Sequence, residues 1–347
     1  MGEKFDLDDI LIQPEIITNI TSRSDVKIWD KNGNLPLFVS PMDTVVDDDN
    51  EELYHQLGLN VCLPRGMEPG NNESFKSLSL KEFKNEYIDN NDQVINSNNH
   101  QNKILIDIAN GHMSDLFDVV EKFKKSSVGK NVELIIGNIA NPDTYRLFCN
   151  LGKYGPDYIR LGIGNGSGCL TTQQLGVGYP MGSLISECSY IKEQYDNPPK
   201  IIADGGMKKY ADIIKSLALG ADYVMLGSLL AKSLESCGSF FEDNLGKSEI
   251  SKEQAKILFD HNRNVFKNFR GMSTKEVQKK WGKTDLKTSE GVSRIYRIEY
   301  TLEGFVSNFE DYLRSAMSYT NCDELNVFIG GPLYNLITQN AHNRFNK

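Results

Sequence analysis

One cysteine, Cys169, stands in a stretch whose residue types could carry out covalent chemistry. The segment GIGNGSGCLTTQQLGVGYP, residues 162–180, holds six glycines, and Ser167, Thr171 and Thr172 place hydroxyl groups near the thiol. A thiol with hydroxyl neighbours in a loop can act as a nucleophile, and glycines let backbone amides approach an anion or turn carbonyls toward a cation. A small buried cysteine in a permissive turn is the alternative. The hydroxyl neighbours favour the nucleophile.

Two later glycine turns could hold an anionic ligand beside that loop. One turn ends at Gly206 and the next at Ser228, separated by about one strand and helix. This spacing is typical of the paired phosphate site that many barrels form after their last two strands, although purely structural turns would look similar. Asp204 suits a hydrogen bond to ribose hydroxyls, and capping of the following helix is its alternative role. A dinucleotide fingerprint matches poorly, because GIGNGSG opens no suitably packed helix.

These residues follow short apolar segments that alternate with amphipathic ones. Helices are predicted at 114–126, 141–152 and 209–220. The alternation predicts an α/β fold, either a (β/α)8 TIM barrel or a doubly wound sheet. A barrel needs eight strands, and the weak candidate for the eighth is QVIN, 93–96. This candidate lies in a polar region, 67–103, whose composition predicts a shortened or irregular unit. Buried parallel strands are predicted at 36–40, 59–63, 103–109, 133–139, 158–164, 200–206 and 223–228.

Composition and charge exclude several classes of function. The formal net charge is −9 and the isoelectric point about 5.2, so nucleic acid and anionic membrane surfaces are not expected partners. No apolar run has the length of a membrane span, and residues 1–14 lack a signal-peptide pattern, so we expect a cytoplasmic location. The six cysteines lie far apart, which predicts free thiols rather than disulfides or a zinc site.

Eight short motifs occur in an order that resembles the IMP dehydrogenase and GMP reductase family. Their order and spacing hold from Phe5 to Cys322. The resemblance implies a (β/α)8 TIM barrel in one catalytic domain over 1–347, with a loop cysteine that attacks C2 of a purine nucleotide. The motifs are SPMDTV (40–45), DIANG (107–111), GIGNGSGCLTT (162–172), GVGYP (176–180), ADGG (203–206), VMLGSLLA (224–231), FRGMS (269–273) and SEG (289–291).

The same resemblance implies roles for individual residues. The catalytic residues would be Cys169, Thr171 and Glu290. The cation loop of the family, which binds K⁺, would use the backbone oxygens of Gly164, Gly166 and Cys169. The cofactor-binding residues for NADPH would be Arg65, Asp107, Ala109, Asn110 and Lys287. The nucleotide-binding residues would be Ser40, Met42, Ser167, Asp204, Gly205, Gly206, Gly227, Ser228, Arg270, Gly271 and Met272.

The segment before Glu290 separates the two branches of the family. The resemblance implies that dehydrogenases of this family carry a long flap with an Arg-Tyr pair, whose arginine activates water. Many of them also carry an insert of paired CBS modules. Here the flap segment, residues 273–291, is short, its interval 273–289 contains no arginine, and no such insert is present. The chain therefore resembles GMP reductase more, which implies NADPH-dependent conversion of GMP to IMP and ammonia.

Other readings of the sequence stay open. An IMP dehydrogenase without insert would convert IMP to XMP with NAD, and a purine-nucleotide sensor would bind without catalysis. A modified or deoxy purine nucleotide could replace GMP as substrate, and Arg65 stands where the family has a His-Lys pair. The resemblance further implies a homotetramer or an octamer. The tail 323–347 is apolar enough to pack against the rest of the chain.

Overall fold

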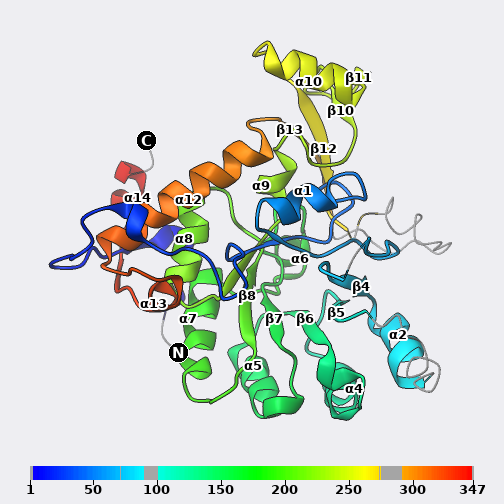
Figure 1. The fold of residues 1–347 in the computed structure, drawn as a ribbon, viewed down its shortest axis with the longest axis vertical. Helices are drawn as coiled ribbons and strands as arrows, with labels where there is room; N and C mark the ends of the chain where they lie inside the picture. Colours follow the sequence, from blue (N-terminus) through cyan, green and yellow to red (C-terminus); the bar gives the residue numbers. More distant parts are fainter. Residues whose placement is uncertain (1–2, 71, 90–100, 273, 275–290, 346–347) are drawn as a thin grey trace.

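The main body of the protein is an eight-stranded parallel sheet that curls on itself (Figure 1). The computed structural model describes residues 3–70, 72–89, 101–272, 274 and 291–345. The strands run in the order β3-β2-β9-β8-β7-β6-β5-β4, so neighbours in the sheet are mostly neighbours in the chain. They are β2 Leu37–Val39, β3 Asn60–Val61, β4 Lys76–Leu78, β5 Lys103–Asp107, β6 Glu133–Ile139, β7 Tyr158–Leu161, β8 Lys200–Asp204 and β9 Tyr223–Leu226.

The two ends of the sheet meet and close it. A parallel bridge joins Cys62, just after β3, to Phe75, just before β4. The Phe75 amide donates to the Val61 carbonyl oxygen at 2.8 Å, and the Leu63 amide donates to the Phe75 carbonyl oxygen at 3.0 Å. With eight parallel strands joined in this way, the predicted (β/α)8 TIM barrel is confirmed.

The described part of the unit at 67–103 has a short strand and an irregular helix, as its composition predicts. Its strand β4 has three residues, and its helix α2, Leu80–Phe83, continues as a π-helical turn over Lys84–Asp89. The eighth strand is therefore Lys76–Leu78, and the predicted strand QVIN at 93–96 lies outside the described residues. The sequence KSL contains a lysine and a serine, so it shows no apolar run that could have marked a buried strand.

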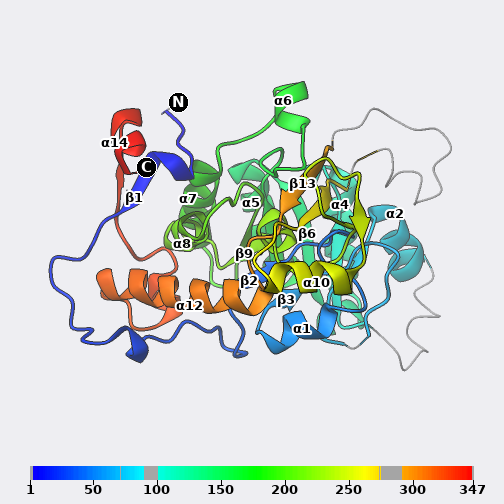
Figure 2. The ribbon, with the colours of Figure 1, turned by 90° about the horizontal axis from the view of Figure 1, so that it is seen from above.

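Helices cover the outside of the barrel, and the three predicted ones are present (Figures 1 and 2). In α4 the residues Leu116, Val119, Val120 and Phe123 are buried, which is the spacing of one helix face. Among the described residues, no helix combines the length and apolar character that crossing a membrane requires. The helices are α1 Glu51–Gln56, α4 Ser114–Lys125, α5 Pro142–Cys149, α7 Met181–Lys192, α8 Tyr210–Ala218, α9 Ser228–Ala231 and α12 Leu302–Tyr319.

A small antiparallel sheet projects from the barrel between α9 and α12 (Figure 1). It has its own apolar core, which includes Leu234, Phe240, Val265 and Ile298. This sheet was not predicted from the sequence. Strand β12 ends at Arg270, so this sheet delivers the FRGMS motif to the barrel. Its elements are β10 Phe240–Phe241, β11 Glu249–Ile250, α10 Lys252–Asp260, β12 Phe266–Arg270 and β13 Ser293–Arg297.

The described chain ends pack together beside α8 and α12 (Figure 2). Strand β1, Ile10–Ile12, pairs antiparallel with β14, Tyr334–Leu336. Helix α13, Leu325–Phe328, buries its first and last residues, and α14, Gln339–Phe345, follows β14. Short 3-10 turns occupy Leu7–Asp9, Arg23–Asp25, Gly129–Asn131 and Gly152–Tyr154.

The inside of the barrel is filled by side chains that point inward from the strands. Four of them are aromatic: Phe38, Phe75, Tyr158 and Tyr223. The rings of Phe38 and Tyr223 meet edge to face at 5.2 Å between centroids, and those of Phe75 and Tyr158 do so at 6.1 Å. Such contacts fix the strand ends that carry the polar residues above them.

We predict that Phe75→Ala will lower the free energy of unfolding by about 3–5 kcal/mol, because the ring is 1% exposed and its loss leaves a cavity where the barrel closes. Urea denaturation followed by circular dichroism measures the change. The matched control is Phe345→Ala, whose ring is 67% exposed and should cost at most about 0.5 kcal/mol. Equal effects of the two substitutions would contradict the prediction.

Candidate active site

The largest concentration of predicted site residues lines one cavity of about 670 Å³ at the carboxyl ends of the barrel strands. The cavity is bounded by the turns after β2, β5, β7, β8 and β9, and by the end of β12. Eighteen of the predicted residues line it, and fourteen of them are Ser40, Met42, Arg65, Asp107, Ala109, Asn110, Ser167, Cys169, Thr171, Asp204, Gly205, Gly206, Gly227 and Ser228. Gly164, Gly166, Gly271 and Met272 line it as well.

The floor of the cavity follows from the alternation of side chains along the strands. Tyr158 and Ile202 belong to the apolar interior, and two residues further Arg160 and Asp204 point inward at the next level. The same step along β5 places Asp107 beside them. The level above the apolar interior is thus polar, and it forms the floor of the site.

Four charged residues cross this floor as one network, which we call the charged row: Arg65, Asp107, Arg160 and Asp204. Arg160 Nη1 donates to Asp107 Oδ1 at 2.7 Å, and Arg160 Nη2 and Nε donate to Asp204 Oδ2 at 2.8 and 3.1 Å. Arg65 Nε lies 3.5 Å from Asp107 Oδ2. Two guanidinium groups therefore balance two carboxylates across the cavity.

The cysteine loop follows β7 and bends over this floor. The Cys169 amide donates to the Gly166 carbonyl oxygen at 2.9 Å, which closes a turn, and helix α6, Thr171–Leu175, begins two residues later. Cys169 Sγ lies 3.2 Å from Thr171 Oγ1, so the predicted neighbours are in contact. In Figure 2, α6 stands away from the rest of the ribbon.

Cys169 differs in exposure from the other five cysteines. It is partly exposed and lines the cavity, whereas Cys62, Cys149, Cys188, Cys237 and Cys322 are buried; all six are free thiols, as predicted. Burial raises the pKa of Cys149 to about 11 and that of Cys237 to about 12. Raised pKa values make buried thiols inert, so Cys169 is the cysteine suited to reaction with a ligand.

Two returning segments hold the cysteine loop in place. A β-carbon on Gly271 would lie 2.3 Å from the Gly168 carbonyl oxygen, so the two backbones meet at a distance that only glycine permits. Gly291 bridges antiparallel to Cys169, and the Val292 amide donates to the Gly168 carbonyl oxygen at 3.1 Å. Glu290 and Lys287, predicted for catalysis and for the cofactor, lie outside the described residues.

Arg270 is the predicted ligand residue that the structure turns elsewhere. Its Nη2 donates to Asp43 Oδ2 at 2.7 Å, and it is not among the residues that line the cavity. Its neighbours Phe269 and Gly271 do line it. Phe269, Gly271 and Met272, rather than this guanidinium, therefore line the cavity near the end of β12.

Sequence reasoning missed two polar residues of the floor, Arg160 and Asn138. Asn138 Nδ2 donates to Asp204 Oδ2 at 2.8 Å and to the Gly162 carbonyl oxygen at 2.7 Å. Both residues stand inside predicted strands, ELIIGNI and YIRLGIG. A charged or amide side chain in an otherwise apolar buried strand was the available signal, since such a group needs a partner when buried.

Metal ligands of the usual kinds do not gather in the described part of the chain. No group of three or more His, Cys, Asp or Glu side chains there could hold a metal ion. The three carbonyl groups of the predicted cation loop belong to Gly164, Gly166 and Cys169, and the Gly166 oxygen already accepts one hydrogen bond. Oxygen atoms of this type suit a monovalent cation, so the donor chemistry is compatible with the prediction.

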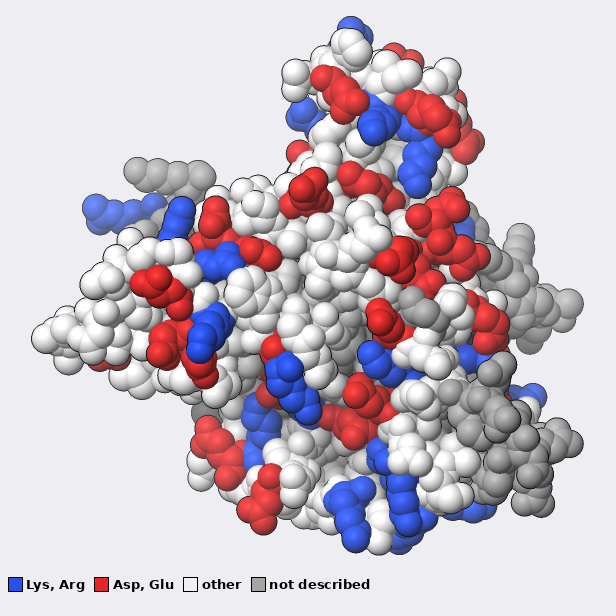
Figure 3. All heavy atoms as spheres, in the orientation of Figure 1, with Lys and Arg blue, Asp and Glu red and all other residues white. Residues whose placement is uncertain are grey.

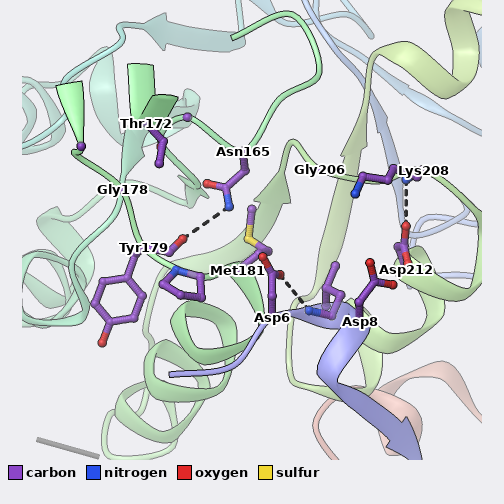
Figure 4. A pocket seen from close by; sticks show the side chains of 14 residues that line it. Asp6, Asp8, Asn165, Thr172, Gly178, Tyr179, Met181, Gly206, Lys208 and Asp212 are labelled. Atoms are coloured by element: carbon purple, nitrogen blue, oxygen red, sulfur yellow. Dashed lines mark hydrogen bonds between the residues drawn. The ribbon is translucent and has the colours of Figure 1, made fainter. Parts of the chain in front are cut away.

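A second cavity of about 450 Å³ lies behind the cysteine loop (Figure 4). Its carboxylates are used within the fold: Asp6 accepts from the Leu7 amide, Asp8 pairs with Lys209, and Asp212 accepts from the Lys208 amide. Cys169 does not line it. We therefore place the candidate active site in the larger cavity.

The surface offers no single-sign region on the face seen in Figure 3, where lysine and arginine are interspersed with aspartate and glutamate. The formal net charge of the whole chain is −9, so its overall charge does not attract anions. Recognition of an anionic ligand therefore depends on the local groups of the cavity.

Curated relatives of two kinds are similar to this chain. An "Inosine-5'-monophosphate dehydrogenase" of Helicobacter pylori is 34% identical over 203 residues, which are 58% of this chain and 37% of that protein. Another of Methanocaldococcus jannaschii is 40% identical over 141 residues, which are 41% of this chain and 27% of that protein. The chain thus spans well under half the length of these two relatives.

A "GMP reductase" of Lactobacillus acidophilus is 28% identical over 340 residues, which are 93% of this chain and 92% of that protein. A protein-family model described as "IMP dehydrogenase / GMP reductase domain" matches residues 83–343 of the chain. These residues include the cysteine loop, both glycine turns and the FRGMS motif. The chain belongs to the IMP dehydrogenase / GMP reductase family.

Proposed function

We propose that the chain is a GMP reductase, which converts GMP to IMP and ammonia with NADPH. The observation that carries the proposal is the accessible Cys169 thiol, 3.2 Å from Thr171 Oγ1 and facing a cavity of nucleotide size. The similarity to a GMP reductase over 93% of this chain supports the reductase branch. The flap segment 273–289, which is short and has no arginine, supports it too.

The nucleotide would lie across the floor with its base toward Cys169. Ser40 and Met42 would contact the base, and Asp204 would accept from the ribose hydroxyls. The phosphate would be held by Ser167 and by the turns that contain Gly205, Gly206, Gly227, Ser228, Gly271 and Met272. Ser228 opens α9, so the amides of its first turn lack acceptors within the helix and can bind an anion.

The reaction would begin with a bond between Cys169 Sγ and C2 of GMP. The C2 amine would then take up a proton and leave as ammonia, while the carbon–sulfur bond remains. Bound NADPH supplies the hydride that C2 accepts. The carbon–sulfur bond finally breaks, sulfur leaves as thiolate, and IMP is released.

Thr171 and Glu290 would handle the proton on the leaving amine. An amine is a poor leaving group until it is protonated, and a carboxyl group near a hydroxyl can supply the proton in a site that excludes water. Thr171 Oγ1 is already in contact with the thiol. Gly291, the residue after Glu290, pairs with Cys169, which brings this part of the chain to the loop.

The cofactor would occupy the side of the cavity that β3 and β5 form. Arg65, Asp107, Ala109 and Asn110 line that side and offer both charged and backbone groups, which fits a dinucleotide ribose and amide. Lys287 would meet the 2′-phosphate that distinguishes NADPH from NADH. The oxygens of Gly164, Gly166 and Cys169 would hold K⁺. A homotetramer and a cytoplasmic location remain predictions.

Purified protein should oxidise NADPH in the presence of GMP, with IMP and ammonia as products. Absorbance at the nicotinamide band and chromatography of the nucleotides measure this. Reduction of NAD by IMP with formation of XMP would instead indicate an IMP dehydrogenase, which the 34% identity to such an enzyme keeps as the second candidate. Binding of GMP without either reaction would indicate a nucleotide sensor.

Cys169→Ser should lower kcat by about 10³-fold or more, since the hydroxyl is a far weaker nucleophile, while affinity for GMP changes less than about tenfold. Mass spectrometry with 6-chloropurine ribotide should show an adduct on the native protein and none on the variant. Cys322→Ser is the control, because this buried thiol is remote from the cavity and should leave adduct and turnover intact. Full activity of Cys169→Ser would reject the covalent mechanism.

Thr171→Val should lower kcat by about 10²-fold with little change in KM for GMP, because it removes the hydroxyl beside the thiol. Thr172→Val is a matched control: its hydroxyl donates to the Val177 carbonyl oxygen at 2.8 Å, so its loss should cost about 1 kcal/mol of stability and change kcat less than about threefold. Steady-state kinetics and thermal unfolding separate the two. Equal loss of kcat in both variants would argue against a role for Thr171 in proton transfer.

A further inference from the structure

The guanidinium group of Arg160 is buried between two carboxylates on the cavity floor. Arg160 is 6% exposed, and its Nη1 and Nη2 donate to Asp107 and Asp204 at 2.7 and 2.8 Å. Burial alone would lower the pKa of Arg160, but Asp204 and Asp107 beside it raise the pKa above its usual value. The side chain is therefore a permanent cation held by two anions.

The fold makes room for this side chain at a single position on the neighbouring strand. A β-carbon on Gly137 would lie 2.6 Å from the Arg160 β-carbon and 2.8 Å from the Arg160 carbonyl oxygen. Gly137 also has a φ of +140°, which other residues rarely adopt. β6 thus provides the space in which Arg160 reaches across the floor.

Asp204 uses its two oxygen atoms differently. Oδ2 accepts three hydrogen bonds: two from Arg160, whose Nε and Nη2 lie at 3.1 and 2.8 Å, and one from Asn138 Nδ2 at 2.8 Å. Oδ1 accepts none from the described residues, and Asp204 lines the cavity. Donors that converge on one oxygen fix the direction of the carboxylate and leave the other oxygen for a ligand donor.

We infer that Arg160, assisted by Asn138, is a positioning residue that aims Asp204 Oδ1 at a hydroxyl group of the nucleotide ribose. The inference rests on the proposed function, since it assumes a purine nucleotide in the cavity. Arg160 itself does not touch the ribose. Its contact with Asp107 anchors the other end of the guanidinium, so the fork cannot rotate away from Asp204.

A lysine at position 160 would keep the positive charge but lose the planar, branched guanidinium group that donates to both carboxylates. A single ammonium group cannot donate to Asp107 and make two parallel bonds to Asp204 in the geometry of the guanidinium. Arg160→Lys should therefore leave the Asp204 side chain free to turn. The contribution of the ribose hydroxyls to the binding free energy should fall, while the contacts to the base and the phosphate persist.

The test compares GMP with 2′,3′-dideoxy-GMP, which lacks the hydroxyl donors, by calorimetric titration. The native protein should bind GMP at least about tenfold more tightly than the dideoxy nucleotide, because the hydrogen bond is to a charged acceptor. Arg160→Lys should reduce this ratio to less than about threefold. A purely structural role would weaken both ligands equally and leave the ratio unchanged, which would overturn the inference.

Two further variants complete the design. Asn138→Ala removes one donor from Asp204 Oδ2, so it should also lower the ratio, and it remains informative if Arg160→Lys fails to fold. Lys124→Met is the matched control: the buried Lys124 donates from Nζ to Asp157 Oδ2, a partly exposed carboxylate, at 2.8 Å. Neither residue lines the cavity, so the loss of this ion pair should leave the ratio unchanged. An unchanged ratio in Asn138→Ala would count against the inference.

The same titration distinguishes a failure of the proposed function from a failure of the positioning role of Arg160. Failure of the native protein to bind GMP would overturn the proposed function and with it this inference. Tight binding of GMP with no preference over the dideoxy nucleotide would leave the proposed function standing and overturn the positioning role. Circular dichroism of each variant shows whether the fold is kept.

Discussion

The guanidinium group of Arg160, shared by two carboxylates at the mouth of the barrel, is the interaction on which the geometry of the site depends. Arg160 sits one level above the aromatic interior, where Tyr158 on the same strand packs against Phe38 and Phe75. Burying a charge is costly unless partners and hydrogen bonds compensate for lost water. The strands satisfy that requirement, because β5 and β8 deliver Asp107 and Asp204 to the same level. The floor of the site is thus fixed by the closure of the barrel.

The reactive and the binding groups come from parts of the fold with different rigidity. Asp107, Arg160 and Asp204 lie on paired strands, whereas Cys169 lies on a loop whose conformation depends on glycines and on two returning segments. Strands hold groups to a narrow geometry, and loops can adjust around a ligand. The proposed covalent chemistry of Cys169 would use the second arrangement, and the proposed contact of Asp204 with the nucleotide would use the first.

The sequence predicted those parts of the fold that bury apolar residues on both faces. Seven barrel strands have such runs, but β4 reads KSL, and its membership in the barrel depends on the bridge between Cys62 and Phe75. Strand β12, FKNFR, alternates too briefly to stand out. Most candidate site residues follow strand ends, so the barrel brings them together. The direction of Arg270 was not predictable, because its partner Asp43 is 227 positions away in the chain.

The choice between reduction and hydrolysis at C2 depends on whether a base can activate water beside the sulfur adduct. Guanidinium can act as a base only when neutral. Arg65 and Arg160, the arginines among the described lining residues, form ion pairs with aspartates, and Arg270 is paired with Asp43. The carboxylates beside Arg160 raise its pKa above the usual value. The segment 273–289 contributes no arginine by sequence. In the proposed GMP reductase reaction, none of these described arginines would be free to act as the base that activates water, which agrees with hydride acceptance at C2.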